Sequence, residues 1–180
     1  MKKNLYGLAE YLWPINRSLT GKGNRLTLNI LKKINPSLKI KKVKSNTQIS
    51  DWKIPLEWNV KDAYILNNKN EKIVNFKKNN LHLMSYSIPF EGKLSFKKLE
   101  KKIKYIKNKP NTIPYTTSYY KRNWSFNMTY NVFKKMKKNE SYFVKIDSKF
   151  SNGFMNYGEI YIPGKSKKEI LFSTYICNPS

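Results

Sequence analysis

Few residues in this 180-residue chain could carry acid–base or metal chemistry. His82 is the only histidine, Cys177 is the only cysteine, and the 11 carboxylates are scattered along the sequence. A zinc site needs three or four nitrogen, sulfur or carboxylate ligands, and a catalytic triad needs a histidine beside a nucleophile and a carboxylate. No nucleophile elbow supports a triad, and His82 lies in a run typical of a strand. We therefore predict no catalytic residue in this chain and a structural or partly exposed histidine.

The segment Thr20-Gly21-Lys22-Gly23-Asn24 could suggest phosphate binding. A phosphate loop of the Walker type needs two glycines at a fixed spacing, a strand before them, and a hydroxyl residue after the lysine. All three features are missing here. We interpret the segment as a loop that leads into a helix.

Residues 113–126 interleave aromatic rings with Lys121 and Arg122, a pattern that can stack bases and follow phosphates. The alternative, which we favour, is an extended segment whose rings cover the core. The formal net charge is +25, but only three of the 36 basic residues are arginine, the side chain best suited to phosphates and bases. AT-rich codons explain the lysines equally well. We do not expect nucleic acid as the partner, although a basic module that binds a polyanion stays an alternative.

The amino-terminal residues do not resemble a signal peptide. The apolar stretch after Lys2-Lys3 is interrupted by Glu10 and ends at Pro14, and no later segment is long and apolar enough to span a bilayer. A single cysteine also excludes an intrachain disulfide. We expect a soluble, cytoplasmic protein with no membrane partner.

Hydrophobic periodicity and turn residues predict four helices and several strands. The second helix should bury Leu26, Ile30 and Ile34, and the third should begin after the N-cap Ser95. Residues 67–70 should form a hairpin loop. The expected helices are 5–12, one ending at 34, 96–106 and 130–136, and the expected strands are 38–43, 59–66, 72–76, 81–86, 142–146 and 155–162.

The run from Glu169 to Ile176 is apolar and β-branched, as in a strand buried in a sheet that is covered on both faces. Active-site groups of open α/β sheets lie just beyond such strand ends. We therefore predict the front of a larger, enzyme-like α/β fold, which would count as α+β when truncated here. The expected parts are a helical front at 1–45, an inserted β-rich domain at 46–150, and a truncated return to the first sheet at 151–180.

Several sequence strings, taken together and in order, carry a family resemblance. The strings are 12–23 (LWPINRSLTGKG), 51–63 (DWKIPLEWNVKDA), 79–87 (NNLHLMSYS), 113–120 (IPYTTSYY), 157–159 (YGE) and 173–180 (STYICNPS). They resemble the bacterial aminopeptidase-like proteins that are often encoded with surface-polysaccharide biosynthesis genes. The resemblance implies a zinc-aminopeptidase-like fold with an inserted β-rich domain and a distant winged-helix domain. This chain resembles the N-terminal part only.

The resemblance also bears on zinc. The family's motif after the last strand reads Cys-His-Pro-Ser, and its histidine is the expected metal ligand, whereas this chain has Asn178 there. A neutral amide is a poor zinc ligand beside imidazole. Another residue of the motif could be the ligand instead. We therefore expect zinc in the full-length family but no metal site and no cofactor in this chain.

These observations favour an N-terminal fragment of an aminopeptidase-like protein linked to polysaccharide biosynthesis, without catalytic competence by itself. An alternative is half of a split zinc aminopeptidase, completed by a second chain that carries the missing half of the fold. The roles of Arg17, Thr20, Asp51, Trp58 and Asp62 stay open, as does the substrate. The structural interpretation makes Trp58 a core residue, Asp62 a turn or paired carboxylate, and Arg17 the partner of an acid.

Overall fold

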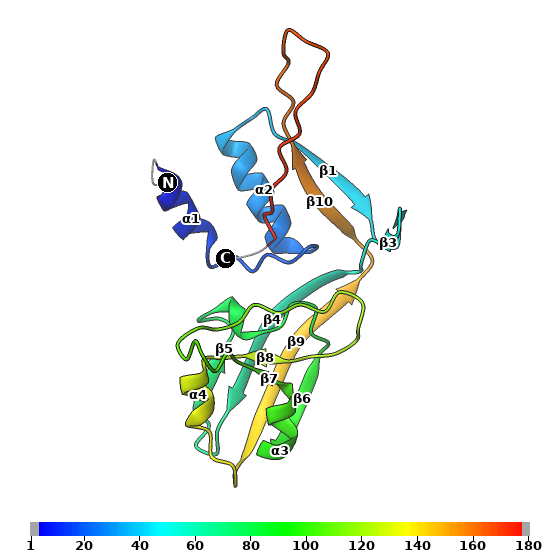
Figure 1. The fold of residues 1–180 in the computed structure, drawn as a ribbon. Helices are drawn as coiled ribbons and strands as arrows, with labels where there is room; N and C mark the ends of the chain where they lie inside the picture. The colour runs from blue at the N-terminus through cyan, green and yellow to red at the C-terminus, as the bar shows by residue number, and fades with distance from the viewer. Residues whose placement is uncertain (1–3, 178–180) are drawn as a thin grey trace. The chain divides into compact units, whose positions relative to one another are not determined.

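The computed structural model describes residues 4–177, which form two compact units (Figure 1). Unit 1 contains the described residues up to Glu57 and those from Ser151 onward, and unit 2 is Trp58–Phe150. Both units mix helices with strands, as the sequence predicted. None of the helices in residues 4–177 is long and apolar enough to cross a membrane.

Unit 1 begins with the two predicted helices, α1 (Leu5–Leu12) and α2 (Lys22–Ile34). The side chain of Asn4 accepts a hydrogen bond from the backbone of Gly7 and so caps α1. The predicted apolar stripe of α2 is wrong, because Leu26 and Ile34 are largely exposed. The buried residues of α2 are Asn24, Thr27 and Leu28.

A two-stranded antiparallel ribbon completes the regular part of unit 1. Strand β1 (Lys39–Lys44) pairs along its whole length with β10 (Phe154–Glu159), so that Lys39 lies opposite Glu159. Leu28 of α2 packs against β10 at Gly158. A short hairpin of β2 (Gln48–Ile49) and β3 (Trp52–Lys53) follows β1.

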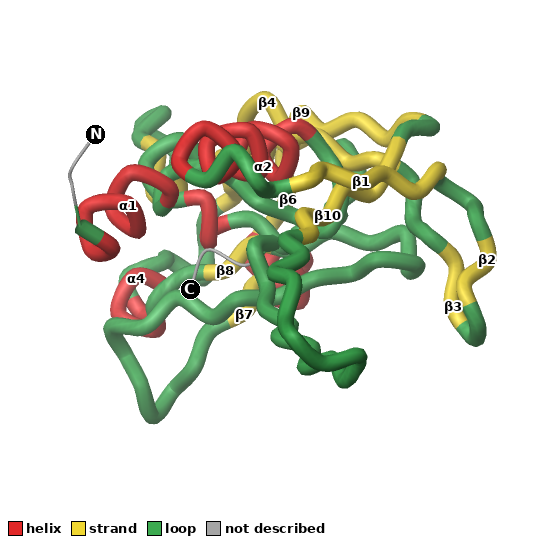
Figure 2. The backbone as a smooth tube through the Cα atoms, turned by 90° about the horizontal axis from the view of Figure 1, so that it is seen from above, coloured by secondary structure: helices red, strands yellow, loops and turns green. Residues whose placement is uncertain are grey.

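The predicted buried strand at 169–176 is wrong. Residues 160–177 form neither helix nor strand, and Figure 2 shows them as loop. The side chains of Ile170, Leu171, Phe172 and Tyr175 are between 83 % and 90 % exposed. A strand needs a neighbour to satisfy its backbone hydrogen bonds, and within residues 4–177 no strand pairs with this segment.

Unit 2 is built on a four-stranded sheet with the order β5-β4-β9-β6. Its strands are β4 (Glu57–Leu66), β5 (Lys72–Asn75), β6 (Phe90–Ser95) and β9 (Ser141–Ser151). The first residue of β4, Glu57, still belongs to unit 1. Strand β5 is antiparallel to β4, and β6 is antiparallel to β9. The predicted hairpin loop joins β4 and β5, where the side chain of Asn67 accepts hydrogen bonds from the backbones of Lys69 and Glu71.

Short elements cover one face of this sheet. They are η1 (Asn80–His82), α3 (Phe96–Leu99), η2 (Glu100–Lys102), β7 (Ile103–Lys104), β8 (Phe126–Asn127) and α4 (Tyr130–Lys134), where η denotes a 3₁₀-helix. Alternate residues of β9 point into the core, as expected for a sheet with one wet face. These are Tyr142, Val144, Ile146 and Ser148.

Two further predictions are wrong in unit 2. The helix expected over 96–106 ends at Lys102, because Ile103 and Lys104 instead pair in parallel with β8. The strand expected over 81–86 does not form: His82 ends η1, and only single bridges follow, at Leu83 and Ser85. Tyr86 then takes a positive φ of 65°, which stops any extended run.

Candidate functional site

The motif near the amino terminus forms a loop, here called the front loop (residues 15–21), that leads directly into α2. Gly23 is needed for close packing, because a Cβ at this position would collide with the carbonyl group of Asn16. The glycine therefore brings two pieces of backbone together. This confirms a loop before a helix, as interpreted from the sequence.

Hydrogen bonds fix the front loop within unit 1. The hydroxyl of Thr20 donates to the carbonyl of Leu56 over 3.1 Å, and its backbone bridges β10 at Met155. The amide of Asn24 reaches back to the carbonyls of Ser18 and Leu19. Thr20, whose role the sequence left open, thus joins the front loop to the residue before β4 and to β10.

An ion pair that the sequence did not predict links α2 to the start of β4. The guanidinium of Arg25 donates two hydrogen bonds of 2.7 Å to the carboxylate of Glu57, which is nearly buried. These bonds raise the pKa of Arg25. Gly153 lies directly against Glu57, where a Cβ would collide with the carboxylate. The only signal in the sequence was the scarcity of acids, 11 against 36 basic residues.

Arg17 and Cys177 lie close enough to interact electrostatically. Arg17 is buried and donates a hydrogen bond of 2.6 Å to the carbonyl of Leu12. Burial lowers the pKa of Arg17, and burial raises the pKa of Cys177 against the opposing effect of the Arg17 charge. The thiol is therefore kept in its protonated form and is not an activated nucleophile. Pairing of Arg17 with an acid stays a prediction.

His82, in unit 2, belongs to a structural network. Its Nδ1 lies 2.8 Å from the carbonyl oxygen of Asn127, so Nδ1 is the donor. The Asn127 amide donates to the carbonyl of Leu81 and accepts from the hydroxyl of Thr116. Burial lowers the pKa of His82, which favours the neutral ring. The structural role predicted for His82 is confirmed.

The other residues singled out in the sequence have structural surroundings. Trp58 is buried, donates from Nε1 to the carbonyl of Ser87 and stacks on Tyr86, which confirms its place in the core. Asp62 forms an ion pair with Lys77 over 3.4 Å, as the paired-carboxylate interpretation predicted. Asp51 is exposed in the turn between β2 and β3.

The aromatic segment 113–126 divides into a buried and an exposed part. The rings of Trp124 and Phe126 are in the core, as we favoured from the sequence. Tyr119 packs edge-on against Tyr86, whereas Tyr120 is 60 % exposed, and Arg122 lies over the ring of Phe150. The expectation that nucleic acid is not the partner stays a prediction.

An open cleft of about 460 Å³ lies on the β6–β9 side of unit 2. An ion pair of 3.1 Å joins Lys145 and Glu91 in its wall, and this hydrogen bond raises the pKa of Lys145. The pair joins the two opposite charges of Lys145 and Glu91, and Asp147 is a further carboxylate in the lining. Its lining is Pro89, Phe90, Glu91, Lys145, Ile146 and Asp147.

The described residues do not fit a zinc ion. Over residues 4–177 there is no group of three or more histidine, cysteine, aspartate or glutamate side chains that could hold a metal. Asn178, at the position of the family's expected ligand, lies outside the described residues. We therefore derive no metal-dependent step from this chain.

Comparison with known proteins agrees with the resemblance seen in the sequence. The chain is 47 % identical over 176 residues to a Clostridium acetobutylicum protein named "Putative polysaccharide biosynthesis protein with aminopeptidase-like domain". The match covers 98 % of this chain and 40 % of that relative. A crystal structure named as a "putative peptidase" from the same organism matches with a TM-score of 0.91 at 47 % identity, over 97 % of this chain and 41 % of that one.

The chain thus spans about two fifths of the length of the relatives that it matches. Within it, residues 57–149 match the family model described as "Domain of unknown function (DUF2172)", nearly the same residues as unit 2. By this match, which extends over half of the sequence, the chain belongs to the DUF2172 family.

Proposed function

We propose that this chain is the front part of an aminopeptidase-like protein of polysaccharide biosynthesis, and that it acts as a structural part without catalytic competence by itself. The name and length of the Clostridium acetobutylicum relative support the assignment. In this proposal unit 2 is the inserted domain, and the two stretches of unit 1 belong to one aminopeptidase-like domain of the zinc-aminopeptidase fold.

The observation that carries the proposal is the uneven distribution of exposed apolar side chains. All but three of the exposed large hydrophobic residues in the described part of the chain lie in unit 1. Extended exposed apolar patches are rare on soluble monomers and mark binding sites, so this concentration in one unit favours a binding role for unit 1. We call them the apolar surface of unit 1: Leu5, Tyr6, Tyr11, Trp13, Leu26, Ile34, Phe154, Tyr157, Ile160, Tyr161, Ile162, Ile170, Leu171, Phe172 and Tyr175.

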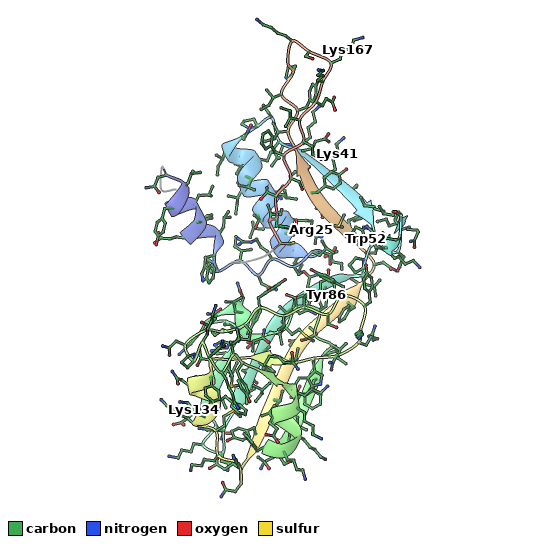
Figure 3. All side chains as sticks on the ribbon, viewed as in Figure 1. Arg25, Lys41, Trp52, Tyr86, Lys134 and Lys167 are labelled. Atoms are coloured by element: carbon green, nitrogen blue, oxygen red, sulfur yellow. The ribbon has the colours of Figure 1, made fainter. Side chains whose placement is uncertain are left out.

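The occupant that we propose for this surface is the polypeptide corresponding to the remaining three fifths of the relative, either in the same chain or in a second one. Segment 160–177 follows β10 as a long loop, and Lys167 lies at the tip of this loop (Figure 3). Its apolar residues Ile170, Leu171, Phe172 and Tyr175 are between 83 % and 90 % exposed. In this proposal these side chains contact the partner polypeptide, which would remove them from water.

The test is co-expression of this chain with the remaining polypeptide of the Clostridium acetobutylicum relative. We expect the two to co-purify and to elute together in size-exclusion chromatography. The relative's own front part, expressed with the same polypeptide, is the positive control. If that control assembles while this chain stays separate, the proposal is wrong.

Zinc analysis of the same sample tests the split-enzyme alternative. If a second chain supplies the metal ligands, the complex should contain zinc and hydrolyse aminopeptidase substrates, whereas this chain alone should do neither. A complex that forms without zinc would support the structural role and exclude the split zinc enzyme.

A further inference from the structure

Three buried side-chain oxygens of unit 1 make no hydrogen bond in the part of the chain that the structure describes. They are Oδ1 of Asn24, Oγ1 of Thr27 and Oδ1 of Asn156. Asn24 and Thr27 are only 3 % and 2 % exposed. Buried polar atoms nearly always have a partner, because leaving one unbonded is destabilising.

The three residues lie on two elements that pack against each other, α2 and β10. Asn24 and Thr27 lie three residues apart on α2 and therefore share a face, next to Leu28. Leu28 contacts β10 at Gly158, and Asn156 points to the same side of β10 as Gly158 because side chains alternate along a strand.

The direction of α2 gives the register. Thr20, just before α2, bridges Met155, and Leu28, in its second turn, contacts Gly158. The helix therefore runs along β10 from Met155 towards Gly158, side by side with it in Figure 1. Its first two turns, which carry Asn24 and Thr27, face Asn156.

The chemistry of the three atoms is complementary to one ligand. The amide nitrogen of Asn24 faces the carbonyls of Ser18 and Leu19, which turns Oδ1 of Asn24 the other way as an acceptor. Oδ1 of Asn156 is also an acceptor, so the two amide oxygens cannot bond each other. The hydroxyl of Thr27 has a hydrogen to donate.

We propose that these residues bind one buried water molecule between α2 and β10. The water donates its two hydrogens to Oδ1 of Asn24 and Oδ1 of Asn156, and it accepts the hydroxyl hydrogen of Thr27. Three bonds are typical of buried water. A calcium or magnesium ion is a poorer occupant, because the three oxygens are neutral and such ions take six or more oxygen ligands. The water ties α2, and with it the front loop, to the β1–β10 ribbon.

The variant Thr27→Val distinguishes two hypotheses: that the three oxygens bind a water, and that they have no hydrogen-bond partner at all. Valine has the same shape, so removing an unbonded hydroxyl would stabilise the chain. Removing a bond to a bound water should instead raise the unfolding equilibrium constant about fivefold, the effect of one typical hydrogen bond. Urea unfolding of the full chain at low concentration, followed by circular dichroism, measures it. The exposed Thr47→Val is the matched control and should change little.

Two further measurements complete the test. The effects of Thr27→Val and Asn156→Leu should be smaller together than the sum of each alone, because both lose the same water. A high-resolution crystal structure of the full chain should show a water within hydrogen-bond distance of all three oxygens. A stabilised Thr27→Val variant, or a crystal structure in which the three side chains bond other partners, overturns the proposal.

Discussion

The guanidinium of Arg25 and the carboxylate of Glu57 face each other in a two-pronged ion pair, with both N–O distances at 2.7 Å. Paired geometry of this kind is the strong form of a charge-assisted hydrogen bond. It connects α2 with the first residue of β4. Thr20 makes a second connection at the adjacent residue, Leu56.

We predict that Glu57→Gln destabilises unit 1 by about 1.5–3 kcal/mol, because Arg25 loses a charged partner that is largely buried. The partly exposed Arg25 can recover some hydration, which favours the lower end of this range. Lys41→Gln is the control, since its ion pair with Glu159 is longer, at 3.9 Å, and exposed. Chemical unfolding of both variants measures the loss in free energy of unfolding. Equal losses would show that the Arg25–Glu57 pair stabilises the chain no more than the exposed Lys41–Glu159 pair.

Gly153→Ala should break the same pair from the other side. The new methyl group would collide with the carboxylate of Glu57 and approach its Cβ to 2.9 Å, so the side chain would have to move. We expect a loss of about 1–3 kcal/mol, as for an overpacked site. Gly164→Ala is the matched control, because nothing lies within 4 Å of its new Cβ. The result is contradicted if the two variants melt at the same temperature.

Local sequence signals predicted the elements whose causes are local. The helix α1 has its cap at Asn4 and its stop at Pro14, and the β4–β5 hairpin has the Asn67 loop. The strands expected at 38–43, 59–66 and 142–146 overlap β1, β4 and β9, although β9 is longer than expected. In these segments nearby residues supply both the hydrogen bonds and the turn.

The wrong predictions concern segments whose partners are distant in sequence. Ile103 leaves the expected helix because Phe126 offers it a parallel bridge, and the apolar run 169–176 has no partner strand among residues 4–177. The Arg25–Glu57 pair also joins residues 32 positions apart. Hydrophobic periodicity describes only neighbours along the sequence. It therefore could not have predicted a bridge such as Ile103–Phe126 or an ion pair such as Arg25–Glu57.

The lowered pKa of His82 predicts a pH-dependent stability. Because burial favours the neutral ring, the unfolded chain binds the proton more readily, and stability rises with pH. The contribution is therefore complete above the unfolded pKa of about 6.5 and decreases as the pH falls below it. Asparagine can retain a donor to the carbonyl of Asn127 without titrating. The loss of stability between neutral pH and about pH 5 should thus be smaller in His82→Asn than in the native chain. Identical pH profiles from urea unfolding would contradict this.

Trp58 should show two separable contributions in unit 2. Its Nε1 bonds the carbonyl of Ser87, which also accepts the hydroxyl of Ser148, so Trp58→Phe leaves that carbonyl with a donor. We expect Trp58→Phe to destabilise unit 2 by about 1–2 kcal/mol from the lost bond and volume. Trp58→Ala should lose about 3–5 kcal/mol, because it also removes a buried ring stacked on Tyr86. Thermal unfolding of the two variants measures the difference, and equal losses would contradict a separate packing contribution.

The apolar surface of unit 1 predicts how the chain behaves without its proposed partner. Exposed apolar segments with β-strand composition template association, so the chain alone should aggregate at high concentration. The double variant Leu171→Asp/Phe172→Asp should increase the soluble fraction, since both side chains are 90 % exposed and support no core packing here. Tyr120→Asp in unit 2, also exposed, should leave solubility unchanged. Light scattering on the three proteins decides the matter. A native chain that is already a monodisperse, cooperatively melting monomer would contradict this prediction. So would a double variant that binds the partner polypeptide as tightly as the native chain does. In either case residues 171 and 172 are not part of a docking surface.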